Sequence, residues 1–176
     1  MNFEFAILDF LQEFLKCDAM DKAMVFITSL GNSGFIWIVI CVILLFTKKF
    51  RKAGFALAIA LILGMILGNW ILKPLFSRPR PSWINDEIIL LIKNPRDFSF
   101  PSGHTLASFA SAFVITHFIK KATFFVYPLA TLISFSRLYL YVHFPTDVIF
   151  GVIFGSFVGY MGVKIAERIK NREHSL

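Results

Sequence analysis

Residues 53–72 read AGFALAIALILGMILGNWIL, a run of 20 residues without a charged side chain. About 20 apolar residues in an α-helix are enough to cross the hydrocarbon core of a bilayer, so this segment predicts a transmembrane helix. The composition of the whole chain agrees, since 57% of its 176 residues are hydrophobic and only 16% are charged. A soluble domain of this length could not bury so much apolar surface. We therefore expect an integral membrane protein.

Four further apolar segments have the length of a transmembrane helix or nearly so, at about 24–46, 103–119, 122–142 and 147–166. The first contains Gly31-Asn32-Ser33-Gly34, which predicts a kink or a locally irregular turn. Residues 3–15 alternate apolar and acidic side chains at helical spacing, which favours an amphipathic helix in the membrane interface. A short sixth transmembrane helix is the alternative for this segment.

The expected fold is all-α and integral to the membrane, a helical bundle of five to six transmembrane helices with an N-terminal interfacial helix and an extracytoplasmic loop 74–100. We expect one domain over 1–176, with the interfacial helix in 1–20 and the transmembrane core in 24–166. The net charge of +7 by itself would suit nucleic acid. The basic residues, however, form short clusters between apolar segments, so no nucleic-acid partner is expected.

These basic clusters predict the orientation of the chain. They follow the first, third and fifth apolar segments, and so fall on one side of the membrane: Lys48, Lys49, Arg51, Lys52, Lys120, Lys121, Lys164, Arg168, Lys170 and Arg172. The positive-inside rule makes that side cytoplasmic. The polar residues considered next then gather on the extracytoplasmic side of the cell membrane.

The long loop has several predicted features. The prolines at 74, 79 and 81 predict that the preceding helix ends and that the chain around Arg80 is extended and stiff. Asn85, followed by two acidic residues and an apolar run to Leu91, predicts a short helix that Asn85 caps. With Trp83, this helix would lie on the membrane and roof the polar residues.

Basic residues beside this loop are candidate anion ligands, because the positive-inside rule predicts few of them on this side. Lys73 and Arg80 are the candidates, whereas Arg78 is interpreted as a basic residue that anchors the segment at the membrane. Ser102 predicts an N-cap, and Gly103 allows close backbone approach. A helix start of this kind presents free N–H groups to an anion, although Pro-Ser-Gly also suits a plain helix start.

The last polar group combines a cation, a histidine and a carboxylate. Arg137 lies inside an apolar run, where a guanidinium is costly and is usually functional or paired. His143 and Asp147 are four residues apart, but Pro145 prevents a shared uninterrupted helix. Thr146 is predicted to cap the final helix, which leaves Asp147 in its first turn. From there the carboxylate can turn back onto the imidazole of His143.

Together, the patterns Lys-x6-Arg-Pro from Lys73, Pro-Ser-Gly-His from Pro101 and Ser-Arg-x5-His-x3-Asp from Ser136 resemble the three-part signature of the type 2 phosphatidic acid phosphatase superfamily. The resemblance implies that His143 is the nucleophile, that Asp147 supports it and that His104 acts as general acid and then as base. It implies a phosphate site without a metal or a cofactor, made by Lys73, Arg80, Ser102, Gly103 and Arg137.

The resemblance also implies a membrane lipid phosphatase that works through a phosphohistidine. Among small bacterial members, undecaprenyl diphosphate is the expected substrate; phosphatidylglycerophosphate, phosphatidic acid and lipid A phosphates are alternatives, because all share the phosphate. Other classes fit less well. An anion channel or transporter would place cations at several depths, and the related haloperoxidases that hold vanadate are soluble. The expected partners are the lipid substrate and the surrounding membrane lipids.

Overall fold

The computed structural model describes residues 3–173, of which the side chains are described as far as residue 169, and this part contains helices and no strands. The side chains of Lys170 and Arg172 from the last basic cluster lie outside it. In chain order the elements are α1 (Phe3–Leu15), α2 (Asp18–Leu30), η1 (Asn32–Gly34), α3 (Phe35–Phe46), α4 (Arg51–Gly64), η2 (Met65–Leu72), α5 (Lys73–Phe76), α6 (Pro81–Ile84), α7 (Gly103–Phe118), η3 (Lys120–Ala122), α8 (Thr123–Tyr139) and α9 (Pro145–Glu173). The prediction of an all-helical chain is confirmed.

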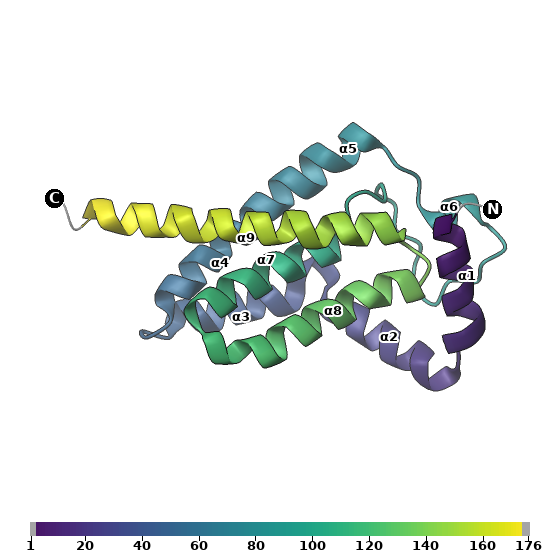
Figure 1. The fold of residues 1–176 in the computed structure, drawn as a ribbon, viewed down its shortest axis with the longest axis horizontal. Coiled ribbons are helices and arrows are strands. Elements are labelled where there is room, and N and C mark those ends of the chain that lie inside the picture. Colours follow the sequence, from purple (N-terminus) through teal and green to yellow (C-terminus); the bar gives the residue numbers. More distant parts are fainter. Residues whose placement is uncertain (1–2, 174–176) are drawn as a thin grey trace.

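Helix α7 lies at the centre of the bundle and packs against α9, α8 and α4 (Figure 1). Its buried face carries small side chains, including the fully buried Ser108, Ala110 and Ser111. Small residues let helix backbones approach closely, which matters where lipid gives no hydrophobic driving force for association. At Gly155 of α9, an added Cβ would lie 2.5 Å from the carbonyl oxygen of Leu106. The two helices therefore meet backbone to backbone.

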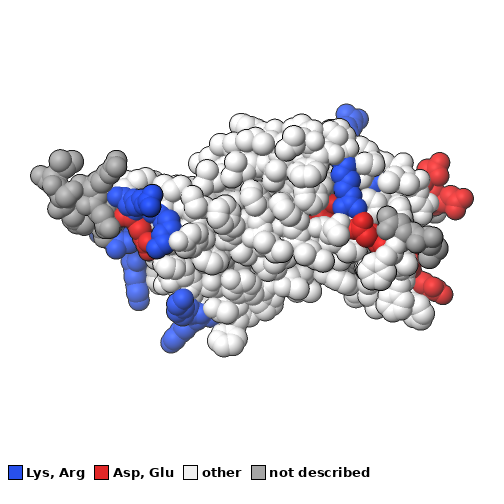
Figure 2. All heavy atoms as spheres, turned by 45° about the horizontal axis from the view of Figure 1, so that its top comes forward, with Lys and Arg blue, Asp and Glu red and all other residues white. Residues whose placement is uncertain are grey.

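The outer surface of the bundle is apolar around its middle. Ile62, Leu132 and Ile153 are 54%, 44% and 64% exposed, and Figure 2 shows a broad band without charged side chains between the two ends of the molecule. Two helices, Arg51–Ile84 and Pro145–Ile169, are long and apolar enough to cross a membrane, and the pair Asp18–Leu30 and Asn32–Phe46 makes a third if it counts as one bent span. Helices α7 and α8 are shorter, at 16 and 17 residues.

The predicted break in the first apolar segment is confirmed. Ser33 has φ 51° and Gly34 has φ 73°, so both residues adopt the left-handed conformation. Glycine takes this conformation without strain, whereas serine rarely does. The axes of the two flanking helices differ by 46°. The break brings Asn32 of η1 against the start of α7.

Two predictions for the long loop are wrong. Asn85 does not cap a helix: its side-chain oxygen accepts the Glu87 N–H at 3.3 Å and closes a local turn. The short helix α6 comes before Asn85 instead, with Pro81 in its first turn, where the fixed φ of proline is favourable. Pro74 does not end the preceding helix either. It stands in the first turn of α5, directly after the π-helical η2, in which the Lys73 N–H reaches a carbonyl five residues earlier.

The contact between α7 and α9 can be tested with Gly155→Ala. The added methyl group must push the two backbones apart, and overpacking of this kind typically costs about 1–3 kcal/mol. We expect a lower thermal unfolding temperature in detergent than for wild type. Ile153→Ala on the exposed face of the same helix is the control and should change it less. Equal unfolding temperatures for the two variants would contradict the packing described here.

Candidate active site

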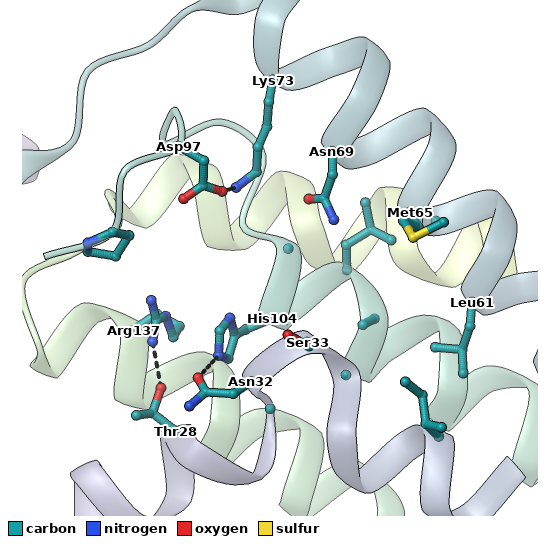
Figure 3. Close-up of a pocket in the computed structure, with 18 of the residues that line it drawn as sticks. Thr28, Asn32, Ser33, Leu61, Met65, Asn69, Lys73, Asp97, His104 and Arg137 are labelled. Atoms are coloured by element: carbon teal, nitrogen blue, oxygen red, sulfur yellow. Dashed lines mark hydrogen bonds and ion pairs between the residues drawn. The ribbon is translucent and has the colours of Figure 1, made fainter. Parts of the chain in front are cut away.

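The three signature segments meet around one cavity of about 1030 Å³ at the end of the bundle that carries α1 and α5 (Figures 1 and 3). Six of the eight predicted site residues line it: Lys73, Arg80, Gly103, His104, Arg137 and His143. Ser102 and Asp147 are fully buried outside the lining. Their backbones are joined, because the Ser102 N–H donates to the Asp147 carbonyl at 3.2 Å. The starts of α7 and α9 are thereby fixed to each other.

The cations of the site are buried. Lys73, Arg80 and Arg137 are 5%, 2% and 3% exposed. Asp97, which sequence reasoning did not assign to the site, pairs with two of them. Arg80 Nη2 donates to its Oδ1 at 2.8 Å. Lys73 Nζ donates to its Oδ2, as Figure 3 shows. No spacing in the sequence links residue 97 to these cations, so only the fold could reveal the pair.

The two cations change the acidity of Asp97. Burial by itself would raise the pKa of this carboxyl, but the ammonium of Lys73 and the guanidinium of Arg80 outweigh burial and lower the pKa to about 2. Asp97 is therefore ionised at neutral pH. The cluster of Lys73, Arg80 and Arg137 with this carboxylate keeps a net positive charge toward the cavity.

His143 lies between a carboxylate and a guanidinium. Its Nδ1 is 3.4 Å from Asp147 Oδ2, and its Nε2 is 3.0 Å from Arg80 Nη1. A guanidinium can only donate, so Nε2 accepts and the ring proton is on Nδ1, toward Asp147. Burial, and then the positive charge of Arg80, hold the pKa of the His143 imidazole well below its ordinary range. The ring is neutral, with the Nε2 lone pair on the Arg80 side and away from Asp147.

Asp147 is held by more groups than were predicted. Its Oδ2 accepts the Phe144 N–H at 2.8 Å and the hydroxyl of Ser99, a residue that sequence reasoning missed. Because α9 begins at Pro145, this Phe144 contact caps the helix. The predicted cap by Thr146 is wrong: the Thr146 hydroxyl donates to Glu4 Oε1 at 2.6 Å.

Arg78 is not a membrane anchor, which corrects our interpretation of the sequence. Its Nη1 donates to Asp147 Oδ1 at 2.6 Å, and its Nη2 donates to Glu4 Oε2 at 2.5 Å. The guanidinium also stacks on the ring of Phe144, at 4.2 Å from the centroid. Arg78 thus connects the first turn of α9 to α1. The N-terminal helix is fastened to the site by Glu4.

On the opposite wall of the cavity, α2 and η1 contact two of the predicted site residues, Arg137 and His104 (Figure 3). Arg137 Nη1 donates to Thr28 Oγ1 at 2.6 Å, and His104 Nε2 is 3.1 Å from Asn32 Oδ1. The predicted cap of α7 is confirmed, since Ser102 Oγ accepts the Thr105 N–H at 3.5 Å. Thr28 and Asn32 were not predicted as site residues, although the break that contains Asn32 was.

One donor of the site has no partner. Among the described residues, Arg137 Nε is the single buried side-chain nitrogen or oxygen without a hydrogen bond. Buried donors are nearly always paired in native proteins, so an unpaired one in a cavity wall points to an acceptor that binds there. No three His, Cys, Asp or Glu side chains within residues 3–169 come together in a way that could hold a metal ion.

The ion pairs of Asp97 can be tested by pH. Because its pKa is lowered on folding, the stability that Asp97 contributes is present above about pH 4, the ordinary range of a carboxyl, and is lost as the pH falls toward 2. We expect wild type to unfold at a higher temperature than Asp97→Asn at neutral pH, with the difference shrinking between about pH 4 and pH 2. A difference that does not change over this range would contradict the assignment.

Comparisons with known proteins identify the family of the chain. A sequence model of the PAP2 superfamily matches residues 52–170. An undecaprenyl-diphosphatase of Sulfolobus acidocaldarius is 34% identical over 147 residues, covering 83% of this chain and 70% of the relative. Phosphatidylglycerophosphatase B of Bacillus subtilis is 31% identical over 163 residues, covering 86% and 77%. The crystal structure of Aquifex aeolicus LpxE superposes with a TM-score of 0.78 at 26% identity, covering 93% of this chain and 96% of that one. The chain belongs to the PAP2 superfamily and is a phosphatase.

Proposed function

We propose that this phosphatase hydrolyses the head group of a membrane lipid at the extracytoplasmic face, with undecaprenyl diphosphate as substrate and undecaprenyl phosphate as product. The observation that carries the proposal is one cavity with three buried cations around a neutral histidine. A phosphoryl group matches such a pocket, because its oxygens take up several charge-assisted hydrogen bonds while phosphorus meets the histidine lone pair.

The cations and the start of α7 would hold the phosphoryl oxygens. Arg137 Nε, buried without a partner, supplies one donor, and Lys73 and Arg80 supply others beside it. The Gly103 N–H belongs to the first turn of α7, where the helix dipole favours an anion. Ser102 acts from behind the cavity as the cap of that helix. Removing one donor of this kind typically costs about 3–4 kcal/mol of transition-state stabilisation.

The geometry supports covalent catalysis by His143. Once Arg80 Nη1 turns from Nε2 to a phosphoryl oxygen of the bound substrate, the freed Nε2 lone pair attacks phosphorus, an N–P bond forms, and the bond from phosphorus to the lipid oxygen breaks. His104 gives its proton to that leaving oxygen. The imidazole becomes positively charged as the bond forms, and Asp147, beside Nδ1–H, stabilises this charge as the carboxylate of a catalytic triad does.

The second half of the reaction releases inorganic phosphate. His104, now neutral, takes a proton from water as that water attacks the phosphohistidine, and the N–P bond breaks. His143 returns to its neutral form and His104 to its protonated form. The cations serve both steps, because the phosphoryl oxygens carry negative charge throughout. In this scheme the two arginines and the lysine neutralise the charge, so no metal is required.

The shape of the cavity supports a lipid substrate. Away from the cations it is lined by apolar side chains of α3, α4 and η2, among them Ile38, Val42, Leu61, Ile62 and Met65. Four of these five are also exposed on the apolar surface of the bundle: Ile38, Val42, Ile62 and Met65. A hydrocarbon chain could therefore lie in this part while its phosphate reaches His143.

The charge distribution supports an extracytoplasmic site. The loops after α3 and α7 and the end of α9 lie at one end of the bundle and carry the basic clusters, whereas the cavity lies toward the other end (Figures 1 and 2). The positive-inside rule then makes the clustered end cytoplasmic. We propose five spans: α2 with α3, α4 through α5, α7, α8 and α9. Helix α1 would lie in the interface, because Phe3, Phe10 and Phe14 are exposed while Leu8 and Leu11 are buried.

A second candidate substrate class is a lipid phosphate monoester such as phosphatidylglycerophosphate, phosphatidic acid or a lipid A phosphate. The similarity to phosphatidylglycerophosphatase B, at 31% identity, favours keeping this class in the tests. Both classes present the same phosphoryl group to His143. They differ in the leaving group, which is a phosphate monoester for the diphosphate and an alkoxide for the monoesters.

The proposal is tested by phosphate release from purified protein in detergent with excess chelator, using undecaprenyl diphosphate, phosphatidylglycerophosphate and phosphatidic acid. We expect release from all three lipids by a metal-free reaction, with the highest kcat/KM for the diphosphate. His143→Ala should abolish release. The enzyme proposal is overturned if wild type releases phosphate from none of the lipids, or if His143→Ala is as active as wild type. A higher kcat/KM for a monoester would identify a lipid phosphate monoester as the substrate instead.

The role of Arg137 is tested by Arg137→Lys. Lysine keeps the positive charge but lacks the Nε–H and the planar fork that contacts two acceptors at once. We expect kcat/KM to fall by about 100-fold, with little change in the unfolding temperature. If Arg137→Lys kept full activity, Arg137 would supply only charge, and the unpaired Nε would not mark the phosphate site.

A further inference from the structure

The broken helix formed by α2, η1 and α3 contributes to the active site through residues outside the three signature segments. Its side chains contact two of the predicted site residues: Thr28 contacts Arg137, and Asn32 contacts His104 (Figure 3). The backbone of Thr28 is a further hydrogen-bond partner of the His104 ring. Asn32 is exposed to the cavity and is the one residue whose side chain is recorded as a hydrogen-bond partner of this imidazole within the described part of the chain.

Gly31 fixes which edge of the His104 ring faces the break. A Cβ placed at Gly31 would lie 2.5 Å from His104 Cδ2 and 2.8 Å from Ile133 Cγ2. The imidazole therefore sits directly on the glycine, in space that a side chain would occupy. Since Cδ2 faces Gly31 and Nε2 contacts Asn32, the Cδ2–Nε2 edge is turned toward the broken helix. Nδ1 belongs to the opposite edge of the ring.

This arrangement determines which ring nitrogen exchanges a proton. The hydrogen bond at one nitrogen of a histidine sets the protonation of the other. When Asn32 Oδ1 accepts from Nε2–H, the proton on Nε2 stays in place, and Nδ1 is the atom that gains and loses a proton. A side-chain amide suits this task, because it is uncharged and leaves the net positive charge of the phosphate site unchanged.

The backbone of the break places Asn32 where it can do this. A continuous helix from α2 to α3 would direct residue 32 along the regular helical spiral, but Ser33 and Gly34 both adopt left-handed conformations immediately after it. Left-handed serine is strained, and strained residues persist where the surrounding structure fixes them, often at functional sites. The predicted kink thus has a consequence beyond bending the helix.

We propose that Asn32 is a positioning residue for the proton transfer: it holds His104 Nε2 so that Nδ1 gives its proton to the leaving oxygen as the phosphorus–oxygen bond breaks, and Gly31 provides the space for the ring. The proton returns to Nδ1 from the attacking water in the second step. This inference rests on the proposed function, which assigns the proton transfer to His104.

The test compares leaving groups. An alkoxide needs a proton from His104 to leave, whereas 4-nitrophenolate is stable enough to leave without one. Asn32→Leu should therefore lower kcat for short-chain phosphatidic acid by about tenfold or more, with KM changed less than threefold or so. The same variant should lower kcat for 4-nitrophenyl phosphate far less. Asn32→Asp keeps an acceptor oxygen at the same place but adds a negative charge to the phosphate site, so it should restore the wild-type ratio of the two kcat values while KM rises.

A second pair of variants tests the same geometry from the glycine side. Gly31→Ala should push the His104 ring and show the same dependence on the leaving group. Gly162→Ala is its matched control: its added Cβ would lie 2.8 Å from the Ala56 carbonyl oxygen, so it is also overpacked, but between α9 and α4 and not against His104. Gly162→Ala should leave the ratio of the two kcat values unchanged even if it lowers stability.

The outcomes separate this inference from the proposed function. If Asn32→Leu slows both substrates equally, or if Asn32→Asp does not restore the wild-type ratio of the two kcat values, the role of Asn32 is overturned while the phosphatase mechanism stands. His104→Ala is the reference, and it should show the strongest dependence on the leaving group. If His104→Ala shows no such dependence, the assignment of His104 as general acid fails, and the inference fails with it.

Discussion

The burial of three cations in an apolar bundle is the constraint on which the rest of the site depends. Isolated charges in such surroundings are very costly, and lipid offers no water to solvate them. Lys73 and Arg80 are stabilised by sharing Asp97, and Arg137 by its bond to Thr28. These partners leave a surplus of positive charge at the cavity. A phosphoryl group brings the negative charge that this surplus favours, so the feature that makes the site costly also makes it selective.

Two departures from regular helix lie close to this charge cluster. The π-helical η2 ends directly at Lys73, and the left-handed residues Ser33 and Gly34 follow the residue that contacts His104. The long loop between α6 and α7 carries Asp97 and Ser99, which contact a cation and a carboxylate of the site. At the opposite end α7 and α9 are regular. The helix backbone is thus irregular where polar side chains must be directed into one cavity.

Much of the fold and the site could be predicted from the sequence, because the relevant signals are local. Apolar segments of the right length predicted the helices, Gly31 to Gly34 predicted the break, and the spacing of the signature predicted eight site residues, six of which line one cavity. The partners could not be predicted, because they come from distant parts of the chain. Asp97, Asn32 and Glu4 stand at no diagnostic spacing from Arg80, His104 and Arg78. The prediction of a helix after Asn85 was wrong for a local reason, since the Asn85 side chain forms a turn as readily as it caps a helix.

The proposed mechanism transfers the phosphoryl group to one defined atom, Nε2 of His143. It is tested most directly by mixing the enzyme with lipid substrate labelled in its terminal phosphate, stopping the reaction in alkali within milliseconds, and mapping the labelled peptide. The hydrogen bonds of His143 place its proton on Nδ1, toward Asp147, and its lone pair on Nε2. We expect the label on the Nε2 atom of His143. Label on Nδ1, on another residue, or on no residue during steady turnover would contradict it.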